Sequence, residues 1–183
     1  MVLVDASHPD MWTRLPPEVV ATLKPPTWKV GAMTFLTRLG VFRLTGGDMA
    51  DCGLPTQQCK EKQAYLRSTR YRITWGQEML APERDAQVRA TENLGDKPLV
   101  VLSAGDHGRD LAAGVSPTAL ARFERTWRNL QGELAALSTD STHIVVEGAG
   151  HSSLQTDRQD ARVTSATIEE VVQAARAGRP LTR

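Results

Sequence analysis

Apolar residues recur along this chain at spacings that predict which segments are strands and which are helices. Residues 99–103 and 143–147 contain continuous apolar runs, which are typical of strands buried in a parallel sheet. Between them, apolar positions three and four apart form one helix face, at Leu120, Phe123, Trp127, Leu130, Leu134 and Leu137. A last helix is predicted from 158 to 177, with an apolar face at Val163, Thr167, Val171 and Ala174. Strand–helix–strand–helix order predicts an α/β fold with a short, mostly parallel sheet and flanking helices.

The first half of the chain is mainly helical. Val2–Val4 is a third short apolar run, and a polar turn follows it over residues 5–10. Prolines and glycines then divide a helical pattern into segments at 17–23, 27–39 and 57–80, with a loop at 46–55. We therefore expect a core of residues 1–10 and 92–183, with residues 11–91 inserted as a helical cap.

Composition excludes several classes of function. The 183 residues are 40% hydrophobic and 23% charged with a net charge of +1, which favours a globular core over nucleic-acid or anionic-membrane binding. The arginines at 67–72 lie among glutamates and are interpreted as a solvated helix face. No apolar run approaches a membrane span, and no signal peptide is recognisable. We expect a soluble, cytoplasmic protein that takes a small-molecule substrate.

The sequence contains no pattern that predicts a cofactor or a metal site. It has no phosphate-binding Gly-rich loop and no dinucleotide fingerprint. His107, His143 and His151 with Asp106 match no recurrent ligand spacing, so no metal is expected. Cys52 and Cys59 match no metal pattern either. We expect two reduced thiols there, with a small disulfide loop as the alternative.

One histidine is placed as a catalytic base would be. The strand at 143–147 runs into Gly148-Ala149-Gly150, and His151 follows at the tip of this small-residue turn. Glycines leave the backbone free and keep space open around the ring. Imidazole takes and returns protons near neutral pH. The alternative is an ordinary surface-loop histidine.

Three segments together resemble the second half of an α/β-hydrolase. They are Val2-Leu3-Val4-Asp5-Ala6-Ser7-His8-Pro9-Asp10, Lys97-Pro98-Leu99-Val100-Val101-Leu102-Ser103-Ala104-Gly105 and Gly148-Ala149-Gly150-His151. The resemblance covers nearly the whole chain and puts the helical segment in the position of the family's cap. It implies a partial α/β-hydrolase fold and a triad of nucleophile, acid and histidine, in which His151 is the histidine.

The resemblance leaves the acid of the triad open. Its usual place is the loop after the 99–103 strand, where Asp106 and, further on, Asp110 are candidates at unusual spacings. Some members, notably one subgroup of haloalkane dehalogenases, take the acid from the end of the strand that corresponds to Val2–Val4, which is Asp5 here. Either strand end can reach the ring of His151. Asp5 and Asp106 are equal candidates, and their alternative roles are a turn cap and a solvated loop carboxylate.

The chain departs from the family at the nucleophile. The Gly-x-Ser-x-Gly elbow occurs nowhere in the sequence, and Ser103, Ser152 and Ser153 lack the strained turn that would expose their oxygens. We therefore expect a truncated, poorly active form of a hydrolase that cleaves an ester or related bond, whose nucleophile lies on a missing N-terminal portion or on another chain. The alternatives are a non-catalytic small-molecule-binding or interaction domain, and a fragment without a function of its own. Loss of the central strands would also expose a sheet edge through which the chain self-associates.

Overall fold

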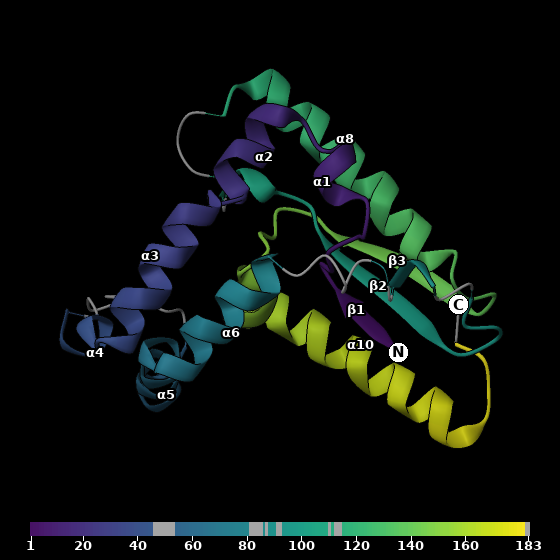
Figure 1. Ribbon diagram of the computed structural model, residues 1–183. Helices are drawn as coiled ribbons and strands as arrows, with labels where there is room; N and C mark the ends of the chain where they lie inside the picture. The colour runs from purple at the N-terminus through teal and green to yellow at the C-terminus, as the bar shows by residue number, and fades with distance from the viewer. Residues whose placement is uncertain are drawn as a thin grey trace. The chain divides into compact units, whose positions relative to one another are not determined.

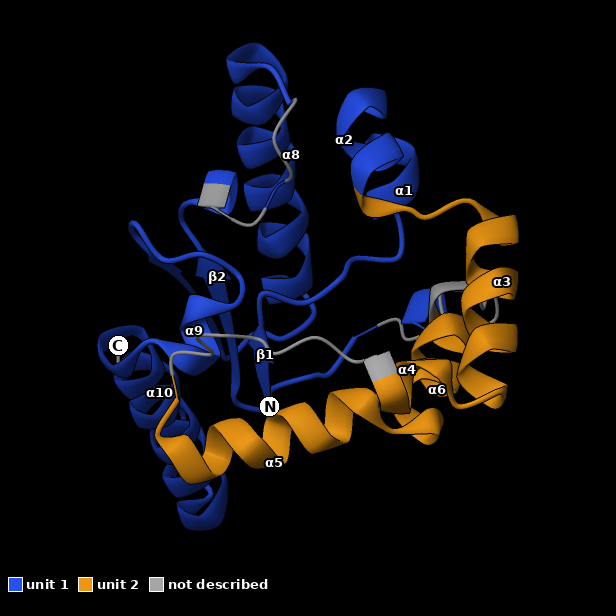
Figure 2. Ribbon diagram, turned by 90° about the vertical axis from the view of Figure 1, so that its left-hand side faces the viewer, with its two compact units in different colours: residues 1–22, 85–183 blue, residues 23–84 orange. Residues whose placement is uncertain are grey.

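The computed structural model describes residues 1–45, 54–80, 86, 88–90, 93–109, 111 and 115–181. The chain divides into two compact units (Figure 2): residues 1–22 with 85–183, here called the sheet unit, and residues 23–84, here called the helical unit. The helical unit lies within the segment expected to be a cap. Helix α1 (Met11–Arg14) and residues 17–22 of α2 (Pro17–Leu23), which the sequence placed in the cap segment, belong to the sheet unit.

The sheet unit is built on three parallel strands in the order β1 (Val2–Val4), β2 (Leu99–Ala104) and β3 (Ser141–Val146) (Figure 1). Leu3 pairs with Val101, which pairs in turn with His143. The mixed α/β class and the parallel pairing predicted from the apolar runs are confirmed. All six residues of β2 are buried because helices cover both faces of this central strand.

The two long helices of the sheet unit lie on opposite faces of the sheet: α8 (Pro117–Ala135) on one and α10 (Arg158–Ala177) on the other (Figure 1). Alternate β2 residues face each helix. Val101 packs with Leu134 of α8, and Val100 packs with Val171 of α10. The side chain of Asp157 accepts hydrogen bonds from the first turn of α10, so this helix begins where the sequence predicts.

The predicted apolar face of α10 is wrong at one position. Val163 is 37% exposed, whereas Thr167 and Val171 are buried. The next residue, Thr164, faces the preceding short helix α9 (Ser153–Thr156), where its hydroxyl donates to the carbonyl of Leu154. The first turns of α10 therefore pack through a different side of the helix than the sequence pattern indicates.

The helical unit contains α3 (Thr27–Arg38), α4 (Val41–Thr45), α5 (Thr56–Arg67) and α6 (Thr69–Leu80). Helix α3 packs against both α4 and α6, and α5 packs against α6. The single helical stretch expected over 57–80 is two helices, because Ser68 is extended, with ψ at 140°, and ends α5. In the parts of the chain that are described, no helix combines the length and apolar character that crossing a membrane requires.

The prediction of two reduced thiols is wrong for Cys59, which lies in α5 and is disulfide-bonded. Cys52 is the only other cysteine of the sequence and lies outside the described residues. Disulfides persist mainly in oxidising compartments, so a cytoplasmic location stays a prediction.

Candidate active site

Three titratable side chains follow the carboxyl ends of the three strands. Asp5 comes directly after β1, His107 begins the short 3-10 helix η1 (His107–Arg109) after β2, and His151 follows β3. Parallel strands place their carboxyl ends at one edge of the sheet, which is where α/β proteins bind ligands. The topology therefore gathers these residues although they are far apart in the sequence.

Asp5 and His151 form the central hydrogen bond of the site. Nδ1 of His151 lies 2.7 Å from Oδ2 of Asp5. The carboxylate is buried, with 1% of its side chain exposed, whereas 52% of the His151 side chain is exposed. Since a carboxylate only accepts, Nδ1 carries the proton, and Nε2 is the basic nitrogen of the neutral ring. The structure thus joins the predicted histidine to one of its two equal candidate acids.

The backbone of Asp5 is strained. Its φ is +44°, and no other non-glycine residue among those described has a positive φ. Asp tolerates this region better than most residues, and such strain is retained where the surroundings hold it. Its N–H donates to the carbonyl of Leu102, and its Oδ1 accepts from the indole N–H of Trp127 at 2.8 Å and the N–H of Ala104 at 3.2 Å. These bonds fix the carboxylate at the sheet edge.

His107 is held between two carboxylates. Its Nε2 lies 3.1 Å from Oδ2 of Asp5, and its Nδ1 lies 3.0 Å from Oε2 of Glu124, a residue of α8. Both ring nitrogens must donate, so the ring is an imidazolium. Burial lowers the pKa of His107, but the hydrogen bonds to Asp5 and Glu124 and the charges of these groups outweigh it and raise the pKa to about 9.

The same contacts keep Asp5 ionised. Burial raises the pKa of its carboxyl group, but the hydrogen bonds from His107 and His151, the positive charge of His107 and the hydrogen bond from Trp127 together hold it well below its usual range. Asp5 is therefore a buried carboxylate that stays charged at neutral pH. A charged acceptor is what fixes the tautomer of a neighbouring imidazole.

Backbone hydrogen bonds set the position of the loop that carries His151. The carbonyl of Ala149 accepts from the N–H groups of Gly105, at 3.1 Å, and Asp106, at 2.9 Å. A Cβ on Gly105 would lie 2.8 Å from the carbonyl oxygen of Val146, so only glycine permits this approach. The loops that follow β2 and β3 are therefore tied together beside the site.

The other residues that the sequence suggested for the site have different hydrogen-bond partners. Oδ1 of Asp106 accepts from the N–H of Gly108 at 3.1 Å, as in an Asx turn. Asp110 lies outside the described residues. The hydroxyl of Ser153 accepts from the N–H of Gly150 and donates to Asp160, which gives it a role in holding the loop. Ser152 occupies the N-cap position of α9 without a side-chain capping bond.

A serine–histidine contact lies inside the sheet unit, apart from the Asp5 cluster. Oγ of Ser103 is 2.9 Å from Nε2 of His143, on neighbouring strands. Ser103 is 1% exposed, so no substrate reaches its oxygen. Burial, and to a lesser extent the charge of Arg128, lower the pKa of His143. Across the described residues, no group of three or more His, Cys, Asp or Glu side chains is arranged to hold a metal ion.

Sequence reasoning missed the residues that support Asp5. His107 was considered only as a metal ligand, Trp127 only as a core residue, and Glu124 was not singled out. A partial signal was present: His107 closely follows the apolar run at 99–103, as Asp5 follows the apolar run at 2–4. Glu124 and Trp127 lie three residues apart on α8 and so point to the same side of that helix.

Comparison with known proteins identifies no relative: no family model, no curated protein and no solved structure matches this chain. The resemblance to α/β-hydrolases therefore stays a hypothesis that depends on its own residues and on the geometry of the site.

Proposed function

We propose that this chain carries the acid–base part of an α/β-hydrolase active site that cleaves an ester or related bond of a small-molecule substrate. In this proposal His151 is the general base and Asp5 holds its ring in the active tautomer. The supporting observation is the 2.7 Å hydrogen bond between a half-exposed imidazole and a buried, ionised carboxylate at the carboxyl edge of a parallel sheet. Such a pair is suited to moving a proton at neutral pH.

In the proposed reaction, Nε2 of His151 takes the proton of a hydroxyl or thiol nucleophile as that atom attacks the substrate carbonyl. The same proton then passes from Nε2 to the leaving alcohol as the carbonyl re-forms. A water molecule then attacks the acyl carbonyl and gives a proton to Nε2, and Nε2 passes that proton to the nucleophile atom as the acid is released. Asp5 stays ionised throughout and stabilises the imidazolium that forms after each transfer.

The nucleophile is the part of this proposal that the chain does not supply. No Gly-x-Ser-x-Gly occurs in the sequence, and the buried Ser103 is engaged by His143. We propose that the nucleophile and the oxyanion hole come from a polypeptide segment outside these 183 residues. The isolated chain then shows little or no hydrolase activity.

The test compares two proteins in the hydrolysis of a p-nitrophenyl acyl ester. One is the 183-residue chain, and the other is the chain extended by the polypeptide that is encoded directly upstream of Met1. Activity of the extended protein that falls about a thousandfold in His151→Gln and in Asp5→Asn supports the proposal. His143→Gln is the matched control and retains activity. Turnover by the 183-residue chain that depends on His151 contradicts it, and an upstream sequence without a nucleophile elbow restricts the proposal to a nucleophile on a separate chain.

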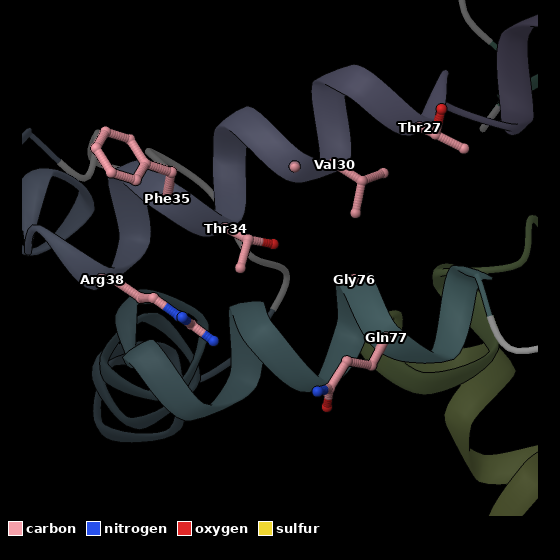
Figure 3. A pocket seen from close by; sticks show the side chains of 8 residues that line it. Thr27, Val30, Thr34, Phe35, Arg38, Gly76 and Gln77 are labelled. Carbon is pink, nitrogen blue, oxygen red and sulfur yellow. The ribbon is translucent and has the colours of Figure 1, made fainter.

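A second candidate function is the binding of a small apolar molecule without catalysis. The observation in its favour is a groove of about 360 Å³ between α3 and α6 of the helical unit, lined by Val30, Thr34, Phe35 and Arg38 (Figure 3). This volume is within the range of small-ligand sites. Phe35 is 62% exposed there, and Arg38 adds a positive charge that favours an anionic ligand.

This candidate is tested with the anionic fluorescent probe 1-anilinonaphthalene-8-sulfonate. Phe35→Asp should weaken its binding about tenfold, because an apolar contact is replaced by a repelling charge. Leu44→Asp is the control, since Leu44 is 89% exposed and does not line the groove. Equal affinities of the two variants would rule out binding in the groove.

A further inference from the structure

Asp5 is shared by two histidines, and only one of them reaches solvent. Oδ2 accepts both from Nδ1 of His151 at 2.7 Å and from Nε2 of His107 at 3.1 Å. The side chain of His107 is 6% exposed, so it does not reach a substrate directly. Whatever it contributes to the site, it contributes through Asp5.

The cation at His107 follows from geometry. A neutral imidazole would turn a lone pair toward one of two carboxylates, Asp5 or Glu124, and both lie within 3.1 Å of its nitrogens. The backbone N–H of His107 adds a third bond, 2.7 Å long, to Glu124. The ring also packs edge-on against the rings of Phe123 and Trp127, which fixes its orientation.

We propose that His107 is a positioning residue: as an imidazolium between Asp5 and Glu124, it holds the Asp5 carboxylate in place and limits how tightly His151 binds a proton. The role in catalysis depends on the function proposed above. The effect on the protonation of His151 does not, and it is measurable without any turnover.

The charges around the cluster give the expected sign. Asp5 and Glu124 are negative and His107 is positive, so the buried cluster has a net negative charge until His151 is protonated. Without the positive charge of His107, Asp5 would attract a proton to His151 more strongly. Other charged groups near the cluster include Asp106, which precedes His107, and Arg128, which lies one turn from Glu124 on α8. Both are common to every variant below.

The opposing effects of Asp5 and His107 on His151 matter because a general base works best when its proton affinity matches the working pH. A hydrogen bond to a buried carboxylate raises the proton affinity of an imidazole. An added cation on the same carboxylate oxygen reduces that affinity while leaving the orienting hydrogen bond in place. His107 thus lowers the proton affinity of His151, which Asp5 by itself can only raise.

The test is a proton NMR titration of the histidine rings in the 183-residue chain. In the wild-type protein, the His107 ring should titrate well above pH 7, and His151 should titrate separately. In His107→Gln the midpoint of the His151 titration should rise by about one pH unit or more, because the positive charge that shares Oδ2 of Asp5 with His151 is removed. His143→Gln is the matched control and should leave His151 unchanged.

Glu124→Gln gives a second measurement if His107→Gln does not fold. It keeps the His107 ring but removes one of its two carboxylate partners, so the His107 titration should move to lower pH. A wild-type His107 that titrates below pH 7, or a His151 midpoint that is the same in folded His107→Gln as in the wild type, overturns the proposal. Absence of ester hydrolysis in the extended protein would contradict the proposed function alone and leave these titrations as they are.

Discussion

Nδ1 of His151 lies 2.7 Å from Oδ2 of Asp5, although 146 positions separate the two residues in the sequence. The contact exists because β1 and β3 flank β2 in a parallel sheet, so their carboxyl ends lie at the same edge. The site therefore depends on the fold of the whole sheet unit. Changes that disturb the sheet should disturb the contact, and the reverse should also hold.

Replacing Asp5 with asparagine should destabilise the sheet unit. The amide has one acceptor oxygen where four groups now donate to a carboxylate, and the His107 cation loses one of its two charge partners. Removing one partner of a buried ion pair lowers the free energy of unfolding by about 3 kcal/mol or more. Urea unfolding at neutral pH measures the loss.

Asp106→Asn is the control for that substitution, because an asparagine oxygen can still accept from the N–H of Gly108. Its free energy of unfolding should stay within about 0.5 kcal/mol of the wild type. Equal losses in the two variants would mean that Asp5 is not the charged centre of the cluster.

The stability of the sheet unit should fall as pH rises from about 7.5 to about 9.5. The folded-state pKa of His107 is raised to about 9 from 6.5, so its contribution is complete below pH 6.5 and is lost as pH passes through 9. One pKa unit corresponds to about 1.4 kcal/mol, so the loss over this range should be about 2 kcal/mol. Urea unfolding at both pH values measures it.

Glu124→Gln provides the comparison for the pH experiment. Removing one carboxylate partner of His107 should make the pH dependence smaller. The N-terminal amine of Met1, whose pKa is lowered by burial, is present in both proteins and so does not affect the comparison. A wild-type free energy of unfolding that is constant over the range would contradict the His107 assignment.

Gly105→Ala should destabilise the site and the sheet. The new Cβ would meet the carbonyl oxygen of Val146 at 2.8 Å and Cα of Glu147 at 2.9 Å, and both are backbone atoms that cannot turn away. Overpacking of this kind costs about 1 to 3 kcal/mol. Thermal unfolding gives the change, and the Asp5–His151 hydrogen bond can be followed through the tautomer of His151 by nitrogen NMR.

Gly132→Ala is the matched substitution at a glycine with open space. Gly132 lies in α8, and nothing approaches an added Cβ within 4 Å. Alanine should therefore stabilise the helix by up to about 1 kcal/mol. If Gly105→Ala were equally stabilising, the loops after β2 and β3 would not be in close contact.

The chain should self-associate through the outer edge of β1. The N–H of Val100 bonds to the carbonyl of Met1 and the N–H of Asp5 to that of Leu102, so alternate residues face β2, and Val2 and Val4 direct their backbone groups away from it. In the described residues β1 pairs with β2 alone. Such an edge is a template for pairing with another strand.

Proline substitutions distinguish edge pairing from folding when one is made at a β1 residue that faces away from β2 and one at a residue that faces β2. Val2→Pro removes an N–H that faces outward and should reduce the mass measured by sedimentation equilibrium without unfolding the chain. Leu3→Pro removes an N–H that faces β2 and should unfold the sheet unit. A wild-type protein that is monomeric at high concentration would contradict association through this edge.

The elements that the sequence predicts best are those whose pattern is local. The apolar run of β2 is buried as expected, and α10 spans the predicted residues because Asp157 and Gly178 cap it. The break at Ser68 was not predicted, because an extended serine between two helices leaves no mark in the pattern of apolar residues. The exposure of Val163 was not predicted either, since it depends on where α9 packs.

The candidate site was predictable only in part. His151 could be named from the strand and the glycine turn before it, and Asp5 only because the resemblance to α/β-hydrolases implies an acid at the end of the first strand. Asp106 could not be separated from Asp5, because the choice depends on which loop faces the ring. The role of His107 depends on Glu124, 17 positions away, and on Asp5, 102 positions away, and no spacing in the sequence relates these three.

The carbonyl oxygen of Ala149 accepts two hydrogen bonds, and these bonds affect how the region tolerates mutation. The bonds from Gly105 and Asp106 to that oxygen involve main-chain atoms alone. Exchanging the side chains around His151 leaves these bonds intact, so the loop can change its side chains without moving the imidazole. Substitutions should therefore be tolerated in these turns, with the glycine at 105 as the position that does not vary.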